Sequence, residues 1–264
     1  MRKKDYHKER LSFLRKAAIA SASATSRRNT IHNVTEVEIS VPRSLMREYQ
    51  SKGKEAISFT GYIAKCFADT ITKYPHFNSF IAGRNIIYIN DIVISILVER
   101  EINHEIVPEP LVIHNCGNKS LLDIHSEIRG AQRDSGQNKH LGQLSGNSWF
   151  RYIPGPFLRA FVRIADKNKK MGTKYGKLAI TSVGMYAKYP IWLIPHGSAT
   201  VLLSIGSIHN KPVLINDKVE NREHLNLTVS FDHDLIDGAP AARFMNDLIS
   251  EISSGHSIAE LLLL

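Results

Sequence analysis

The sequence predicts one α/β domain in which helices pack on a mixed or mostly antiparallel sheet. Apolar and polar side chains alternate along residues 225–232, which is the period of a half-buried strand. Beyond Gly238, apolar residues recur at the helical spacing instead, with Ala241, Phe244 and Leu248 on one face. The length of 264 residues and the apolar content of 43% suit a single domain with a sizeable core.

Similar local patterns predict the other elements. Ser58 can cap a helix that Pro75 stops, and Asn103 with His104 suits a turn between two strands. The predicted helices cover residues 8–25, 42–50, 58–74, 119–133, 157–171 and 238–254. The predicted strands cover residues 34–41, 86–88, 91–99, 105–113, 177–183, 199–209 and 223–232, with a hairpin near 210–216. The order of the strands in the sheet does not follow from these patterns.

Several classes of protein are not indicated. No run of residues approaches the roughly 20 apolar residues of a membrane span. Arg15 and Lys16 stand where a signal peptide needs its apolar centre, so we expect no export and a cytoplasmic protein. Cys66 and Cys116 suggest neither a disulfide framework nor a metal site, and the histidines lack ligand spacing.

The segment L-T-V-S-F-D-H-D-L-I-D-G at 227–238 is the strongest candidate for chemistry. His233 follows the predicted strand with the parity of its apolar face, so we expect its side chain to point inward. An imidazole at a strand end beside a helix start can act as a general base. The alternative is a buried structural histidine, with Asp237 serving only as the helix N-cap before Pro240.

Four segments in order resemble the acyltransferase component of 2-oxo-acid dehydrogenase complexes, the dihydrolipoyl acyltransferases. The 227–238 segment is similar to their H-x-x-x-D-G signature, to which the signature of chloramphenicol acetyltransferase is related. The other three are Y-P-H-F-N-S-F at 74–80, N-K-S-L-L-D-I-H-S-E-I at 118–128 and G-K-L-A-I-T-S-V-G-M at 176–185. Together they span about 10–256, nearly the whole chain. The resemblance implies a two-layer sandwich of helices on a large mixed sheet, of the chloramphenicol-acetyltransferase type.

The resemblance also implies a reaction. An acyl group would pass directly between coenzyme A and a thiol acceptor such as a lipoyl group, with His233 as the general base. Thr181 matches the family's serine and would stabilise the oxyanion, with Ser182 as the alternative donor. Asp237 would support the site by pairing with Arg15 from the first helix. Acetylation of a small hydroxyl compound and a non-catalytic assembly scaffold are the rival functions.

The chain departs from the family pattern at specific places. Asp234 stands where the family usually has arginine, and residues 147–175 look like a basic insertion. We expect no lipoyl domain before the catalytic region, so either the lipoyl carrier is a separate protein or the acceptor is not lipoate. Residues 1–9 are expected to be a flexible basic N-terminus.

The resemblance implies a homotrimer with active sites between subunits, which could join into a larger cubic-type assembly. The apolar tail at 257–264 is the expected interface between trimers. Neither a metal nor lipoate bound to this chain is expected.

The net charge of +9 needs a separate explanation. The densest basic stretch, 151–177, contains Arg151, Arg159, Arg163, Lys167, Lys169, Lys170, Lys174 and Lys177 against one acid, Asp166. No nucleic-acid-binding motif accompanies it, so nucleic acid is not the expected partner. The stretch is either a solvated helix face or a patch that attracts coenzyme A phosphates, an acidic carrier domain or anionic lipid.

Overall fold

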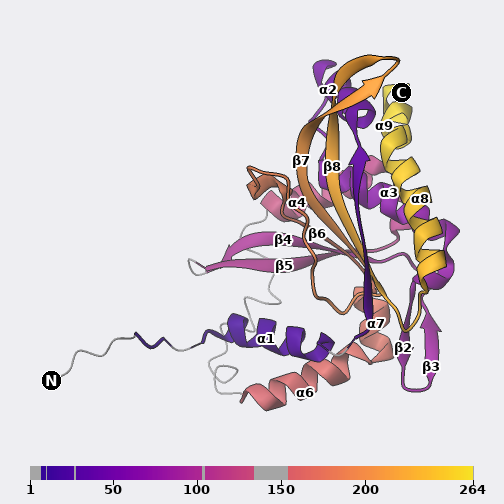
Figure 1. The fold of residues 1–264 in the computed structure, drawn as a ribbon. Helices are drawn as coiled ribbons and strands as arrows, with labels where there is room; N and C mark the ends of the chain where they lie inside the picture. The colour runs from indigo at the N-terminus through magenta and orange to yellow at the C-terminus, as the bar shows by residue number, and fades with distance from the viewer. Residues whose placement is uncertain (1–6, 10, 27, 103–104, 134–153, 264) are drawn as a thin grey trace.

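A mixed sheet forms the centre of the molecule (Figure 1). The structure is a computed structural model that describes residues 7–9, 11–26, 28–102, 105–133 and 154–263. Within these residues the sheet has six strands in the order β1-β8-β7-β6-β4-β5. They are β1 (Thr30–Glu38), β4 (Ile94–Ile102), β5 (Glu105–Ile113), β6 (Leu178–Ser182), β7 (Val201–Ile215) and β8 (Lys218–Asp232). β6 is parallel to β4 and β7, and the other neighbours are antiparallel, so the sheet is mixed as predicted.

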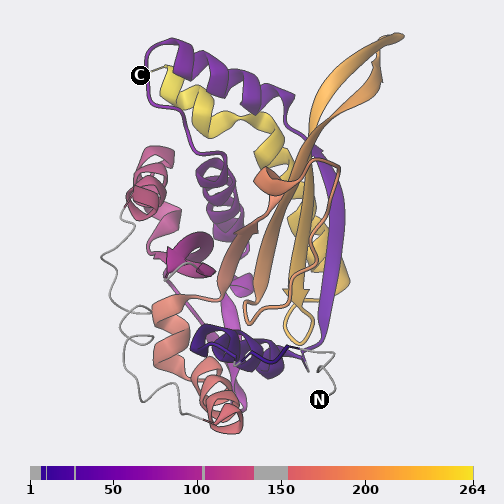
Figure 2. The same ribbon diagram turned by 90° about the vertical axis from the view of Figure 1, so that its left-hand side faces the viewer.

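A helical layer packs on one face of this sheet (Figures 1 and 2). It contains α2 (Ser40–Ser51), α3 (Phe59–Lys73), α4 (Leu121–Arg133), α8 (Gly238–Ser254) and α9 (His256–Leu262). The centre of the layer is α3, which begins at the predicted cap, where the Ser58 hydroxyl accepts a hydrogen bond from the Gly61 N–H. At the junction between this layer and the sheet, the ring of Phe77 stacks on that of Phe244, and Phe231 meets both rings edge to face.

The second face of β8 is also covered. The Asn226 side chain donates to the carbonyl oxygen of Ile191, at 3.1 Å, and Trp192 donates to that of Thr35, at 3.1 Å. The segment between β6 and β7 therefore lies along the sheet, and the strand from Leu225 to Asp232 is buried on both faces. The alternation along this strand predicted one buried and one exposed face. It instead reflects two kinds of cover, because one face packs on the helical core and the other on polar side chains and backbone.

Two helices form a separate layer at one end of the molecule. α1 (Phe13–Thr25) and α6 (Gly155–Asp166) pack against each other, and α7 (Lys169–Tyr175) follows (Figures 1 and 2). The single helix predicted over 157–171 is wrong, because the Asn168 side chain accepts hydrogen bonds from the N–H groups of Lys170 and Met171 and starts a new helix.

Other element boundaries also differ from prediction. The strand predicted at 34–41 ends at Glu38, because α2 begins at Ser40 and accommodates Pro42 in its first turn. β7 and β8 extend through the expected hairpin to a two-residue turn at Asn216 and Asp217, both with positive φ. A short pair, β2 (Ser79–Ala82) and β3 (Asn85–Tyr88), includes a strand that was not predicted.

The C-terminal tail, expected as an interface, forms α9, whose Ile258 is fully buried in the chain's own core, although Leu263 is exposed. Any role of the tail between trimers stays a prediction. The basic N-terminus (1–6), the turn at 103–104 and the loop at 134–147 lie outside the described residues. None of the described helices is long and apolar enough to cross a membrane.

Candidate active site

His233 lies in the turn that joins β8 to α8. Its backbone N–H donates to the carbonyl oxygen of Asn29, at 2.8 Å, which ties the turn to the start of β1. The side chain was expected to point inward, and this is wrong for a single chain, because 43% of it is exposed. β8 ends at Asp232, where the N–H groups of Leu235 and Ile236 both donate to its carbonyl oxygen. The strand parity therefore no longer applies at His233.

The imidazole of His233 has a defined proton arrangement. Its Nδ1 lies 3.0 Å from the carbonyl oxygen of Ile236, which can only accept a hydrogen bond. Nδ1 therefore carries the proton, and Nε2 keeps its lone pair. The Asp237 carboxylate lies 3.8 Å from the same Nδ1 but is 87% exposed, so the Ile236 carbonyl is the closer partner. An imidazole held this way presents Nε2 as a base.

Thr181 is far from His233 within one chain. Thr181 on β6 is paired with Ser204 on β7, which is paired with Thr228 on β8. His233 comes five residues after Thr228, which is roughly 16 Å along the sheet at the usual strand rise. The Thr181 and Ser182 hydroxyls form no hydrogen bond with another described residue, so both are free to donate. One chain alone does not place either hydroxyl and His233 around the same reacting atom.

The expected pair of Arg15 and Asp237 is not formed within one chain. Both side chains are exposed, and no ion pair joins them in the described part of the structure. Arg15 lies in the first turn of α1, where its N–H donates to the hydroxyl of the cap residue Ser12. The resemblance to the family placed Arg15 on the first helix and Asp237 in the H-x-x-x-D-G turn, where the structure also has them. It gave no distance between the two residues.

A different charged network supports the turn. Arg28 contacts Asp166, at 2.6 Å, and Asp232, at 3.0 Å, and Lys177 contacts Asp166, at 2.7 Å. We call these four residues the Arg28–Asp232 network. Burial raises the pKa of Asp166, but Lys177 and Arg28 outweigh it and hold the pKa below its usual range. Burial dominates at Asp232 and raises its pKa despite Arg28.

The Arg28–Asp232 network connects parts of the chain that are distant in sequence. Arg28 precedes β1, Asp166 ends α6, Lys177 precedes β6, and Asp232 directly precedes His233. Sequence reasoning missed the network, although Asp166 was noted as the one acid in the basic stretch. Asp234, which replaces the family's usual arginine, accepts a hydrogen bond from the Asn29 side chain at 2.8 Å. The turn bearing His233 is thus held on both sides.

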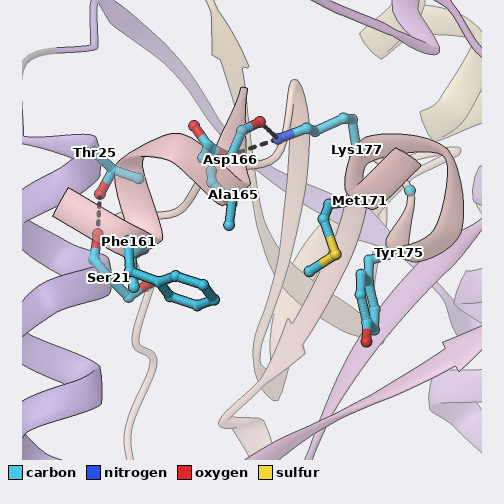
Figure 3. Close-up of a pocket in the computed structure, with 12 residues that line it drawn as sticks. Ser21, Thr25, Phe161, Ala165, Asp166, Met171, Tyr175 and Lys177 are labelled. Carbon is cyan, nitrogen blue, oxygen red and sulfur yellow. Dashed lines mark hydrogen bonds and ion pairs between the residues drawn. The ribbon is translucent and has the colours of Figure 1, made fainter. Parts of the chain in front are cut away.

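Two hollows have Asp166 in their linings. The larger, about 370 Å³, reaches Asp234 beside His233 and is lined by Arg163, Lys167 and Phe80 among others. The smaller, about 210 Å³, is lined mainly by apolar side chains of α6 and α7. In Figure 3, Phe161, Met171 and Tyr175 surround it, beside the contact of Lys177 with Asp166. Three cations (Arg28, Arg163 and Lys167) and three carboxylates (Asp166, Asp232 and Asp234) line the larger hollow, so its charges balance overall. Arg163 and Lys167 are its exposed cations, and an anionic group such as a phosphate would meet these two.

No alternative nucleophile or metal centre is apparent in the described residues. No group of three or more His, Cys, Asp or Glu side chains there is arranged to hold a metal ion. Both cysteines are buried, and burial raises the pKa of Cys116 to about 12 and that of Cys66 still further. Neither thiol is ionised at neutral pH.

Comparison with known proteins identifies the family. The family model for the 2-oxoacid dehydrogenases acyltransferase (catalytic domain) matches residues 3–148 and 165–262, most of the chain. The chain belongs to this family. It is 24% identical over 233 residues to a dihydrolipoyllysine-residue acetyltransferase component of the pyruvate dehydrogenase complex from Rickettsia bellii, covering 86% of this chain and 48% of that protein. The chain thus spans about half the length of such relatives.

Solved structures of acyltransferase catalytic cores share the fold. One is the cubic core of the pyruvate dehydrogenase multienzyme complex, with a TM-score of 0.69, 18% identity, and coverage of 97% of this chain and 94% of that one. A second, with the same TM-score, identity and coverage, is the dihydrolipoamide acetyltransferase of Azotobacter vinelandii. It is described in terms of a serine, a histidine and an asparagine in the catalytic mechanism. The acyltransferase family model leaves 149–164 unmatched, which includes most of α6.

Proposed function

We propose that this chain is a coenzyme-A-dependent acyltransferase that passes an acyl group between coenzyme A and a thiol, such as a lipoyl group on a carrier. The observation that carries the proposal is the hydrogen bond from Nδ1 of His233 to the Ile236 carbonyl, which leaves Nε2 available as a base. Family membership supports the same chemistry. Histidine is the side chain that most often acts as a general base in enzymes.

The proposed reaction needs no covalent intermediate on the protein. Nε2 of His233 takes the proton from the acceptor thiol, and the thiolate attacks the thioester carbonyl carbon to give a tetrahedral oxyanion. The Thr181 hydroxyl of a neighbouring copy donates a hydrogen bond to that oxyanion. The carbonyl then re-forms, the bond to the departing sulfur breaks, and that sulfur takes the proton from the imidazolium. Asp237 and Arg15 would support the site across the same boundary between copies.

The separation of Thr181 from His233 supports a site shared by two copies. The strand register separates the two residues by roughly 16 Å along the strands of one chain, which supports a hydroxyl supplied by a neighbouring chain. A homotrimer, with further assembly like that of the cubic core, is the proposed state. Arg163 and Lys167 in the larger hollow are the proposed contacts for coenzyme A phosphates. The cytoplasmic location stays a prediction.

The first test is acyl transfer from a panel of acyl-coenzyme A thioesters to dihydrolipoamide. His233→Ala should abolish transfer while the protein keeps its wild-type circular dichroism spectrum. Thr181→Ala should lower the rate by about 10²–10³-fold. A folded wild-type protein that transfers nothing to any thiol would refute the proposal, as would full activity in His233→Ala. In those cases a hydroxyl acceptor and a scaffold role would remain to be tested.

The second test asks whether two copies build each site. When His233→Ala and Thr181→Ala chains are refolded together, random mixing gives intact residue pairs at about one boundary in four. Activity should therefore return to about a quarter of the wild-type value. Each variant refolded alone is the control. Failure of the mixture to regain activity would refute the shared site.

A further inference from the structure

An apolar stripe on α6 is largely exposed, and one of its members, Phe161, also borders the smaller hollow. Phe157, Phe161 and Ile164 follow the spacing of one helical face, and their side chains are 70%, 66% and 71% exposed. The opposite face carries Leu158, which is buried, and Asp166, which belongs to the Arg28–Asp232 network. The helix is therefore fixed to the body of the molecule by one face while presenting large apolar side chains on another.

The charged side chains around this stripe have one sign. The exposed charged residues of α6, α7 and the link between them are Arg159, Arg163, Lys167, Lys169, Lys170 and Lys174. The one acid among the described residues of this region, Asp166, is neutralised by Arg28 and Lys177. An amphipathic helix with aromatic and aliphatic side chains beside lysines and arginines has the composition of helices that lie in the plane of a bilayer surface.

The position of α6 leaves the stripe accessible to a flat surface. Figures 1 and 2 both place α6 at the lower edge of the described molecule, with α1 between it and the sheet. Among the described residues, α6 therefore lies at an edge from which a helix can enter a planar interface.

A second copy of the chain is a less suitable occupant. The acyltransferase family model does not match residues 149–164, so Phe157, Phe161 and Ile164 lie outside the part of the chain that matches the family. The centre of a protein–protein interface is also depleted in lysine, whereas lysines follow this stripe closely. Acidic headgroups match the basic side chains, and acyl chains match the apolar ones.

We propose that α6 and α7 attach this protein peripherally to anionic phospholipid bilayers, with Phe157, Phe161 and Ile164 inserted among the lipids and the surrounding lysines and arginines contacting headgroup phosphates. The attachment uses neither His233 nor Thr181, and it does not require Arg163 and Lys167, the two cations proposed for coenzyme A phosphates, because Arg159, Lys169, Lys170 and Lys174 remain for the headgroups.

The test is sedimentation of the full chain with phosphatidylcholine vesicles, with and without phosphatidylglycerol. The protein should sediment with the phosphatidylglycerol vesicles, and less so as the salt concentration rises. Phe157→Ser/Ile164→Ser should weaken partitioning by about tenfold or more. The matched control is Leu214→Ser/Val219→Ser at the tip of the β7–β8 hairpin, where the side chains are 68% and 72% exposed. This control should bind as the wild type does.

A charge variant completes the design. Arg159→Gln/Lys169→Gln/Lys170→Gln should bind phosphatidylglycerol vesicles more weakly. Removal of an equal number of charges elsewhere, in Lys54→Gln/Lys73→Gln/Arg84→Gln, should have a smaller effect.

Three results would overturn the proposal. They are no binding to phosphatidylglycerol vesicles, equal losses in the α6 and hairpin variants, and a lower oligomeric mass of the α6 variant by light scattering. The last result would show that the stripe joins copies of the chain. Acyl transfer without vesicles should stay unchanged in Phe157→Ser/Ile164→Ser, so failure of the lipid proposal and failure of the transferase proposal are distinguishable.

Discussion

Asp166→Asn should destabilise the protein more than any other neutralisation in the Arg28–Asp232 network. The Lys177 side chain is only 6% exposed, and its ammonium contacts the Asp166 carboxylate, at 2.7 Å, and the Asp166 backbone carbonyl, at 3.0 Å. Removing the carboxylate charge leaves a buried cation with neutral partners. Breaking such a pair typically lowers the free energy of unfolding by 3–5 kcal/mol, and an amide oxygen can still accept a hydrogen bond, so we expect about 3 kcal/mol.

Lys177→Met should cost less, because the network is asymmetric. Asp166 keeps its contact with Arg28 at 2.6 Å when Lys177 is lost, and methionine fills a similar volume. We expect about 1 kcal/mol for this change. The comparison variant is Asp69→Asn, which removes the more exposed pair of Asp69 with Lys65 within α3 and should cost about 0.5 kcal/mol.

The measurement is urea unfolding followed by circular dichroism at one protein concentration, because an oligomer's apparent stability depends on concentration. The expected order of cost is Asp166→Asn, then Lys177→Met, then Asp69→Asn. A cost for Lys177→Met above that of Asp166→Asn would refute the reasoning, as would equal costs for Asp166→Asn and Asp69→Asn.

Three further predictions concern acid, thiols and glycines. The pKa of Asp166 is lowered in the folded state, so its ionised carboxylate should stabilise the protein above about pH 4. This stabilisation should be lost as the pH falls through the folded pKa. In urea unfolding at several acidic pH values, the free energy of unfolding should therefore fall less steeply for Asp166→Asn than for the wild type. Cys66 and Cys116 should resist iodoacetamide at pH 8 in the native protein and react once it is unfolded, as read by mass spectrometry, and rapid native labelling would contradict their burial. Gly184→Ala should lower both stability and acyl transfer, because the added Cβ would overlap the Gly206 carbonyl oxygen just after the Thr181 strand. Gly130→Ala, where no atom lies within 4 Å of the added Cβ, should instead stabilise α4 by up to about 1 kcal/mol, and thermal unfolding of both variants would decide this.

Local patterns in the sequence predicted the elements that carry the site. The alternation along 225–232 placed the strand before His233, and the apolar spacing after Gly238 placed α8 with its observed end at Ser254. Ser58 and Pro75 marked the ends of α3 for reasons of hydrogen bonding and steric fit. The predicted helix at 157–171 failed because a side-chain cap at Asn168 outweighed a continuous apolar pattern.

The orientation of the candidate catalytic residues required the tertiary structure. Strand parity suggested an inward His233, but the turn after Asp232 changes the direction of the chain and exposes the ring. Its partner, the Ile236 carbonyl, is close only in that turn. The pairing of Arg15 with Asp237 was expected from the family resemblance, and no local pattern could test the distance between them.

By itself, the sequence determined the family, the α/β class and the residues that could carry acyl transfer, because short motifs and side-chain periodicity are local properties. The tertiary structure decided that Arg28, Asp166, Lys177 and Asp232 meet beside His233, and that Thr181 lies too far along the sheet to join it within one chain. Both results depend on strand order and register. These arise from packing among segments that are distant in the sequence, and no local pattern encodes them.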